Sequence, residues 1–244
     1  MDALSVAAVV CPVSLVVAYA TGALLPCRGP HDWLVPDALW RSPPRTVALT
    51  FDDGPDPVGT PAVLDLLRRA GATATFFLIG ERAERLPSLV RRIAAEGHSV
   101  GLHGWKHQSM PLLTPARLDA DLARCAATLE SLLGSAPRLV RPPYGRRDVR
   151  VYLAARRRHL TPVMWSFDSR DWLPRSRADI ARRLDRVRSG DIVLLHDGLP
   201  RRAAMLDAVD ALLDRLRAVQ LPSVALRPPS GSGALPPTAR SAGA

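Results

Sequence analysis

The sequence has almost no lysine and few aromatic residues, which excludes several classes of protein. Lys106 is the only lysine among 33 basic residues, and the arginines form scattered pairs on helix-like stretches. Aromatic residues make up 5% of the chain, and no stripe interleaves them with basic residues. A nucleic-acid footprint requires a clustered basic face, so we expect no nucleic-acid partner. The net charge of +10 is compatible with attraction to an anionic cell wall or lipid surface.

Cysteine is also scarce. The three cysteines, Cys11, Cys27 and Cys125, are odd in number and widely spaced. This spacing excludes a disulfide framework and a zinc ribbon. Cys125 falls within a helix-like stretch, where a cysteine is expected to be a small buried apolar residue. No segment repeats at a regular period, so a solenoid is excluded as well.

Only one stretch is apolar enough to cross a membrane. Residues 3–25 carry no charge, and a helix of about 20 apolar residues spans the hydrocarbon core of a bilayer. Ala18-Tyr19-Ala20 resembles a signal cleavage site, although no basic residue precedes the apolar run. We therefore expect residues 1–27 to be a signal or anchor segment, with the protein extracytoplasmic and either secreted or membrane-anchored through residues 3–25. The arginines that follow favour the alternative, a membrane protein that faces the cytoplasm.

Composition divides the rest of the chain. Residues 28–44 are rich in proline and are expected to form a linker. Residues 227–244 are rich in proline, glycine, serine and alanine and are expected to be a disordered tail. Residues 45–226 remain for one folded domain, and nothing in them indicates an obligate protein partner.

Short apolar runs alternate with longer amphipathic stretches along this domain. We predict strands at Thr46–Phe51, Thr75–Ile79, Ser99–Leu102, Leu139–Arg141, Pro162–Trp165, Asp191–Leu195 and Ser223–Leu226. We predict helices near residues 60–71, 82–96, 115–133, 148–158, 177–188 and 202–218. Continuous apolar strands separated by helices are typical of an α/β fold with a buried parallel sheet. About seven such units suit a distorted, incomplete (β/α) barrel, and an open doubly wound sheet is the alternative.

Reactive side chains follow several of the predicted strands. Asp52 and Asp53 end the first strand and need a bend to act together, because neighbouring side chains on a strand point to opposite faces. His103 and His107 follow the third strand at a spacing that lets both histidines bind one metal ion. Since the carboxyl ends of parallel strands share one edge of the sheet, these residues are expected to converge.

The other strand ends add further candidates. Arg141 ends the fourth strand before a rigid Pro-Pro-Tyr-Gly loop, and it is expected to face inward and to need a carboxylate partner. Asp168 follows the fifth strand, and His196 closes the sixth. Strand ends that carry Asp, His, Arg, Asp and His indicate one catalytic rim. His31, His98 and His159 lie elsewhere and are not assigned to it.

These residues resemble the motifs of the metal-dependent polysaccharide deacetylases with a NodB homology domain, carbohydrate esterase family 4. The resemblance covers about residues 45–226 and includes five motifs in order: Thr50–Asp53, His103–His107, Arg141–Gly145, Asp168–Trp172 and Leu194–His196. It implies a NodB-type barrel that hydrolyses the N-acetyl group of an amino sugar.

The resemblance also implies a role for each residue. Asp53, His103 and His107 would bind the metal, and Asp52 would be the general base. Arg141 would orient Asp52, and His196 would be the general acid, tuned by Asp168. The Tyr144 N–H would help to form the oxyanion hole, and Trp172 and Leu194 would line the acetyl pocket. Gly104 departs from the family pattern of serine or threonine, and the lost hydroxyl is expected to loosen the metal loop.

The expected activity is removal of N-acetyl groups from N-acetylglucosamine polymers or oligomers of the peptidoglycan or chitin type. Two alternatives remain: a deacetylase of a small-molecule or lipid-linked amino sugar, and an inert sugar-binding barrel. The expected cofactor is a divalent metal, with zinc as the first candidate. An Asp/His₂ set also accepts cobalt, nickel or manganese.

Overall fold

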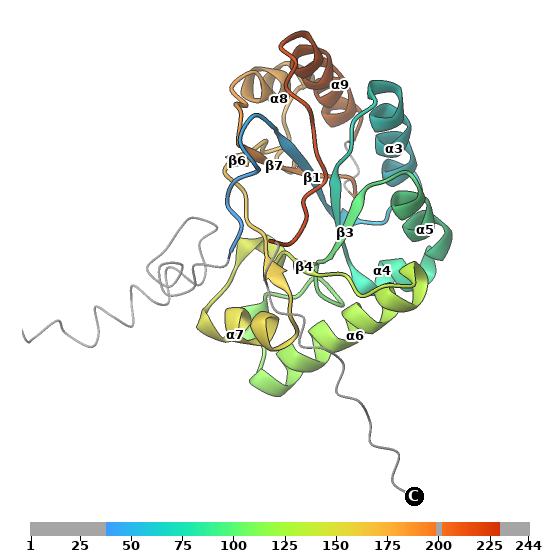
Figure 1. Ribbon diagram of the computed structural model, residues 1–244, viewed down its shortest axis with the longest axis vertical. Coiled ribbons are helices and arrows are strands. Elements are labelled where there is room, and N and C mark those ends of the chain that lie inside the picture. The colour runs from blue at the N-terminus through green and yellow to red at the C-terminus, as the bar shows by residue number, and fades with distance from the viewer. Residues whose placement is uncertain (1–37, 199–201, 230–244) are drawn as a thin grey trace, which may run out of the picture.

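The structure is a computed structural model that describes residues 38–198 and 202–229. Its strands are β1 (Ala48–Gly54), β2 (Thr75–Leu78), β3 (Ser99–Leu102), β4 (Leu139–Val140), β5 (Thr161–Pro162), β6 (Phe167–Asp168) and β7 (Ile192–His196). Its α-helices are α3 (Gly59–Ala70), α4 (Gly80–Arg85), α5 (Pro87–Ala95), α6 (Pro115–Leu133), α7 (Val149–Arg157), α8 (Arg177–Leu184) and α9 (Arg202–Ala218). Two 3₁₀ turns, η1 (Met110–Leu112) and η2 (Pro143–Gly145), lie in loops after β3 and β4. The helices surround the strands (Figure 1).

All seven strands belong to one parallel sheet in the order β5-β4-β3-β2-β1-β7-β6. The two edge strands are β5 and β6, yet only residues 163–166 separate them in the sequence. A chain spans at most about 3.6 Å per residue, so the two edges of the sheet lie within about 18 Å of each other. The sheet must therefore curl, and the predicted incomplete (β/α) barrel is confirmed.

Alternation along the strands decides which side chains face the barrel interior. In β1, Leu49 and Phe51 join the main core under the helices, whereas Ala48 belongs to the smaller cluster inside the barrel. Residues of the Ala48 parity, including Asp52, consequently face inward. His103 lies two residues beyond Gly101, and Arg141 lies two residues beyond the interior Leu139. By the same alternation, both residues face inward. The strand period alone thus carries polar residues from several strands to one interior rim.

Two of the predicted strands differ from the structure. Residues 223–226 are not a strand: Ser223 makes one isolated bridge to Val47, after which the N–H groups of residues 225 and 226 bond to threonine hydroxyls instead of a ladder. The seventh strand is β6, which lies just beyond the strand predicted at 162–165. The extended segment 161–168 pairs with β4 at its beginning and with β7 at its end, so it forms two short strands rather than one.

The helix predicted at 82–96 is two helices, α4 and α5. Leu86 between them has φ −127° and ψ 54°, outside the helical region. Pro87 explains the break, because its ring disfavours helical geometry in the residue before it and it has no N–H to donate.

The predicted linker also joins the barrel earlier than expected. Leu39 pairs with Val163, and Arg41 pairs with Asp191 and binds its carboxylate at 2.7 Å. This part of residues 28–44 therefore belongs to the fold. Residues 1–37, which include the apolar run and Cys27, lie outside the described residues, as does the tail from residue 230. Across residues 38–198 and 202–229, no helix combines the length and hydropathy needed to cross a membrane.

Candidate metal and catalytic site

The two aspartates of β1 are brought together by a bend in the strand. The pairing of β1 with β2 shifts register between Asp52 and Gly54, and Asp53 has a left-handed φ of 71°. This conformation takes Asp53 out of strand alternation. As a result, the Nε2 atom of His103 lies 3.7 Å from Asp52 Oδ2 and 3.4 Å from Asp53 Oδ1. The predicted bend is confirmed.

His103 and His107 complete a cluster of three candidate metal ligands with Asp53. His107 has a φ of 55° and places Nε2 3.0 Å from Asp53 Oδ1. One donor atom from each of the three residues lies within 4.8 Å of the other two. Hence the structure brings together the three residues that the sequence singled out as a metal-binding set.

The geometry of the cluster fits a zinc-like ion. Ligands about 2.0–2.1 Å from a tetrahedral zinc ion are about 3.4 Å apart, close to the two separations from Asp53 Oδ1. That oxygen is buried, yet no group among the residues that the structure describes meets hydrogen-bond geometry with it. A buried carboxylate oxygen without a donor is costly unless a cation satisfies it. An Asp/His₂ set with further positions open is typical of a catalytic metal site.

The tautomer of His103 also suits metal binding. His103 Nδ1 lies 2.7 Å from the carbonyl oxygen of Arg141, which can only accept a hydrogen bond. Nδ1 therefore carries the proton, and Nε2 presents its lone pair to the cluster. Burial opposes ionisation of Asp53, but the nearby imidazoles of His103 and His107 outweigh burial and hold its pKa well below the usual range.

The loop between the two histidines is clamped by its backbone. The N–H groups of Gly80 and Glu81, at the start of α4, donate to the carbonyl oxygens of Gly104 and Trp105 at 3.0 Å each. Asp121 of α6 accepts the Trp105 N–H at 3.0 Å. Gly104 has a φ of +75°, and a Cβ there would lie 3.2 Å from the Asp121 carboxylate. Gly104 is therefore suited to this backbone. The hydrogen bond from Trp105 to Asp121 holds the loop in place and opposes the loosening that was expected from the missing hydroxyl.

The Trp105 side chain anchors the same loop to the protein. Trp105 is 5% exposed, and a Cβ on Gly80 would lie 2.4 Å from its ring. The guanidinium of Arg124 lies 3.8 Å above the ring, within the range of cation–π contacts. The metal loop is thus packed against α4 and α6.

Arg141 is buried and holds Asp52, as the sequence predicts. Its side chain is fully buried, and Nη1 donates to Asp52 Oδ1 at 2.8 Å and to the Thr50 hydroxyl at 2.7 Å. Nε and Nη2 donate to the carbonyl oxygens of Val163 and Met164. Burial lowers the pKa of Arg141, while the charge of Asp52 opposes that effect. Asp52 is consequently fixed with its second oxygen toward His103.

His196 lies beside Asp52 on the neighbouring strand β7 and is held by Asp171. The ring Nδ1 of His196 lies 2.8 Å from Asp171 Oδ1, and the backbone N–H of His196 donates to Asp171 Oδ2 at 2.8 Å. The Ser169 hydroxyl also donates to Asp171. Burial by itself lowers the pKa of His196, but the hydrogen bond to Asp171 and the charges of Asp171, Asp52 and Asp53 raise it to about 9. The imidazole is therefore protonated near neutral pH.

The prediction that Asp168 tunes His196 is wrong, because Asp171 occupies that place. Asp168 Oδ1 instead accepts the backbone N–H of Arg170 at 2.8 Å and caps its own turn. Both aspartates lie in the same predicted motif, Asp168–Trp172. Spacing alone could not tell which carboxylate would reach the histidine.

Of the three predicted substrate-binding residues, Tyr144 contacts this cluster. The ring of Tyr144 lies 4.4 Å from that of His107, and Tyr144 has a φ of 59°. Within the described residues, no hydrogen bond uses the Tyr144 N–H. Trp172 follows Asp171 and is 52% exposed, whereas Leu194 is buried beside Thr50 in the sheet.

Two further residues that sequence reasoning missed support the β1 turn. Arg82 of α4 donates to the carbonyl oxygen of Asp53 at 2.7 Å. Asp197 is buried, accepts the Thr60 hydroxyl, and would lie 2.7 Å from a Cβ on Gly54. Burial raises the pKa of Asp197 to about 7. In the sequence, Asp197 directly follows the histidine that closes a strand, which is a weak signal for a role beside the site. Arg82 lies within a helix, and its position in the sequence gives no such signal.

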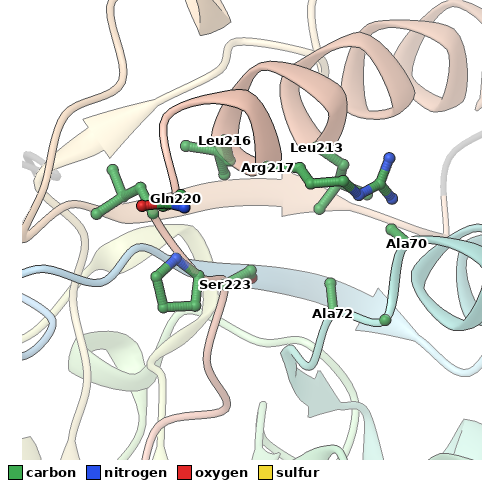
Figure 2. A pocket seen from close by; sticks show the side chains of 10 residues that line it. Ala70, Ala72, Leu213, Leu216, Arg217, Gln220 and Ser223 are labelled. Carbon is green, nitrogen blue, oxygen red and sulfur yellow. The ribbon is translucent and has the colours of Figure 1, made fainter.

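The described pockets lie away from this cluster. A cavity of about 310 Å³ lies between the C-terminal ends of α3 and α9, where Ala72, Leu216 and Ser223 line it (Figure 2). Ser223 pairs with Val47, just before the start of β1. This cavity therefore lies near the N-terminal end of β1, whereas the aspartates lie at its C-terminal end. It takes no part in the chemistry of the rim.

Comparisons with known proteins show which family this chain resembles. The family model described as "Polysaccharide deacetylase" matches residues 41–163. A peptidoglycan-N-acetylglucosamine deacetylase of Bacillus cereus is 38% identical over 183 residues, covering 73% of this chain and 85% of the relative. A chitooligosaccharide deacetylase of Azorhizobium caulinodans is 39% identical over 165 residues, covering 66% of this chain and 79% of the relative.

A solved structure extends the match to the fold. The family 4 carbohydrate esterase from Streptomyces lividans, in complex with acetate, superposes with a TM-score of 0.70 at 34% identity, covering 75% of this chain and 93% of the esterase. The barrel and its rim define a hydrolase of the metal-dependent deacetylase class. The chain belongs to the polysaccharide deacetylase family, carbohydrate esterase family 4.

Proposed function

We propose that the chain is a zinc-dependent hydrolase that acts outside the cytoplasm and removes N-acetyl groups from N-acetylglucosamine units of a cell-wall or chitin-type glycan. The observation that carries this proposal is the placement of Asp52 and His196 beside the Asp53–His103–His107 cluster. Asp52 faces His196 across paired strands, and Asp53 follows directly in the turn. The named relatives act on peptidoglycan and on chitooligosaccharides, which supports this substrate class.

Asp53, His103 and His107 would hold the metal. When bound, a divalent ion polarises the acetyl carbonyl and lowers the pKa of a water molecule toward about 7. Asp52 is the proposed general base, because Arg141 fixes one of its oxygens and leaves the other toward the cluster. The buried Arg141 keeps this carboxylate in one orientation through a charge-assisted hydrogen bond.

His196 is the proposed general acid. An amine leaves an amide only if it receives a proton, and the raised pKa of His196 keeps its imidazole protonated at neutral pH. Asp171 positions the ring through both Nδ1 and the backbone. Asp52 can therefore accept a proton from water and His196 can donate one to the leaving amine, each from its own strand.

The Tyr144 N–H is the proposed donor to the oxygen of the tetrahedral intermediate. It has no partner among the described residues, and its residue contacts the ring of His107. Removing one such donor costs about 10²–10³ in rate in other hydrolases. Trp172 and Leu194 are proposed to line the pocket that receives the acetyl methyl group.

Acetate release tests this function directly. Purified protein would be assayed on peptidoglycan, on N-acetylglucosamine oligomers and on monomeric N-acetylated conjugates, before and after chelation and after zinc is restored. We expect release from a polymer or oligomer that chelation abolishes and zinc restores. Release from monomeric conjugates alone would favour a small-molecule deacetylase, and no release from any substrate would favour an inert sugar-binding barrel.

A further inference from the structure

A fully buried arginine, Arg147, follows the loop that carries the Tyr144 N–H. The residue is 0% exposed, although arginine is seldom buried unless its donors are satisfied. Nη1 donates to the carbonyl oxygen of Gly145 at 2.7 Å, and Nε donates to the hydroxyl of Tyr152 in α7 at 3.1 Å. The guanidinium carbon lies 4.9 Å from the centroid of the Trp40 ring. Arg147 therefore ties the Tyr144 loop to a helix and to the segment that precedes β1.

The backbone of this loop has a conformation that needs such support. Tyr144 has a φ of 59° and a ψ of 9°, and Gly145 has a φ of 64°, so two consecutive residues are left-handed. Glycine adopts this conformation freely, but a tyrosine is strained in it and keeps it only where surrounding contacts hold it. Arg147 supplies one such contact, because it bonds to the residue directly after Tyr144.

Two hydrogen bonds in series connect Arg147 to the peptide group of the Tyr144 N–H. Nη1 of Arg147 donates to the Gly145 carbonyl oxygen at 2.7 Å. The N–H of that same peptide group belongs to Arg146, and it donates to the Pro143 carbonyl oxygen at 3.1 Å. The Pro143 carbonyl shares its own peptide group with the Tyr144 N–H. We call these two bonds the Arg147 relay.

The Arg147 relay acts on both the direction and the strength of the Tyr144 N–H as a donor. Because a peptide group is planar, fixing its carbonyl oxygen also fixes the direction of its N–H. A carbonyl that accepts a hydrogen bond polarises the N–H of its own peptide group, and hydrogen bonds in series strengthen one another. The cationic guanidinium at the start of the relay adds to this effect, since charge-assisted hydrogen bonds are stronger than neutral ones.

We propose that Arg147 is a positioning residue for deacetylation, which orients and polarises the Tyr144 N–H through the relay. This inference rests on the proposed function, in which that N–H binds the oxygen of the tetrahedral intermediate. Such a donor acts more strongly in the transition state than in the ground state, so the loss of Arg147 should lower kcat and leave KM nearly unchanged. Zinc binding should also be unchanged, because the relay includes none of the three proposed ligands.

The test compares two variants of Arg147 with two controls. Arg147→Gln removes the charge, whereas the conservative variant Arg147→Lys keeps it. Arg156→Gln removes the same charge from an exposed position on α7, and Leu129→Ala removes buried side-chain atoms from α6. The kcat and KM of acetate release would be measured on the substrate that the wild type deacetylates fastest. Zinc content and melting temperature would be measured on each protein.

We expect Arg147→Gln to lower kcat per bound zinc about tenfold, a fraction of the loss of about 10²–10³ that follows removal of an oxyanion donor. Arg147→Lys should lie between the wild type and Arg147→Gln, because an ammonium keeps the charge but lacks the planar fork that reaches both Gly145 and Tyr152. Arg156→Gln and Leu129→Ala should keep the wild-type kcat per bound zinc, although Leu129→Ala lowers the melting temperature.

An NMR measurement separates the relay from a purely structural role. The chain has three tyrosines, so labelling with ¹⁵N-tyrosine gives at most three amide signals, and Tyr144→Phe identifies the one from Tyr144. The Tyr144 amide proton should move upfield in Arg147→Gln, because a less polarised N–H is more shielded. It should return toward its wild-type position in Arg147→Lys, and Leu129→Ala should leave it in place.

Crystals of the zinc-loaded wild type with acetate, the reaction product, keep the inference testable if Arg147→Gln does not fold. The Tyr144 nitrogen should lie about 3 Å from an acetate oxygen, with both bonds of the Arg147 relay intact.

Three results would overturn the inference. The first is a wild-type kcat in Arg147→Gln. The second is a fall in kcat without a shift of the Tyr144 signal, or an equal fall in Leu129→Ala, because either would indicate a purely structural role. The third is an acetate complex in which the Gly145 carbonyl turns away from Arg147. Failure of the proposed function is distinguishable, because the wild type itself would then release no acetate.

Discussion

Replacing Asp171 with asparagine tests the proposed acid most sharply. In the wild type, Asp171 accepts a hydrogen bond from His196 Nδ1 at 2.8 Å, and this contact helps to raise the pKa of His196 from 6.5 to about 9. A hydrogen bond to a charged group contributes about 1.5–3 kcal/mol. Since one pH unit corresponds to about 1.4 kcal/mol, Asp171→Asn should lower the pKa of His196 by about one to two pH units.

The sign of the effect on stability follows from the same shift. The folded-state pKa of His196 lies above its unfolded value of 6.5. Protonation therefore stabilises the fold fully below 6.5, and this contribution is lost as the pH rises through about 9. The free energy of unfolding should differ most between wild type and Asp171→Asn just below pH 6.5 and should differ less as the pH approaches 9.

The assay is an NMR titration of the His196 imidazole in metal-free protein, paired with the pH dependence of acetate release in zinc-loaded protein. At high pH, activity falls as His196 loses its proton, and this fall should occur at a lower pH in the variant than in the wild type. Asp168→Asn is the matched control, because that carboxylate bonds to the Arg170 N–H and not to His196. An unchanged His196 pKa in Asp171→Asn, or an equal fall in Asp168→Asn, would refute the assignment of Asp171.

Three further predictions concern the base, the metal and the metal loop. Asp52→Asn should retain zinc in elemental analysis but lose nearly all acetate release, and an active zinc-replete variant would exclude Asp52 as the base. His107→Ala should lose bound zinc while keeping its circular dichroism spectrum, and full retention of zinc would remove His107 from the ligand set. Asp121→Ala should weaken zinc affinity about tenfold in a competition titration, because it frees the Trp105 N–H. Asp121→Asn keeps an acceptor and should bind nearly as wild type, and equal affinity in all three proteins would show that Asp121 does not position the loop.

The sequence was sufficient to predict the barrel and the residues of its rim. Buried apolar strands that alternate with helices predict a parallel sheet, and the carboxyl ends of such strands share one edge. Strand parity then brings Asp52, His103 and Arg141 to the interior face. The bend that lets Asp53 join them was predicted from side-chain alternation, and the structure places it at a register shift.

The errors arose where local sequence does not determine a partner. Asp168 and Asp171 are three residues apart, and only the turn capped by Asp168 shows that Asp171 reaches His196. The tie from Asp121 to the metal loop spans 16 residues between a helix and a loop, so it depends on packing that no short motif records. The last predicted strand failed because the pairing ends after Val224, and threonine hydroxyls rather than a neighbouring strand accept the N–H groups of Ala225 and Leu226.

The convergence of Asp53, His103 and His107 on one cation is the basis of the proposed chemistry. The most direct measurement is a crystal structure of the zinc-loaded protein with anomalous diffraction recorded at the zinc edge. We predict one anomalous peak about 2.0–2.2 Å from an Asp53 carboxylate oxygen and from Nε2 of both histidines, with Asp52 and His196 beside it. A peak bound elsewhere, or no peak at saturating zinc, would contradict the assignment.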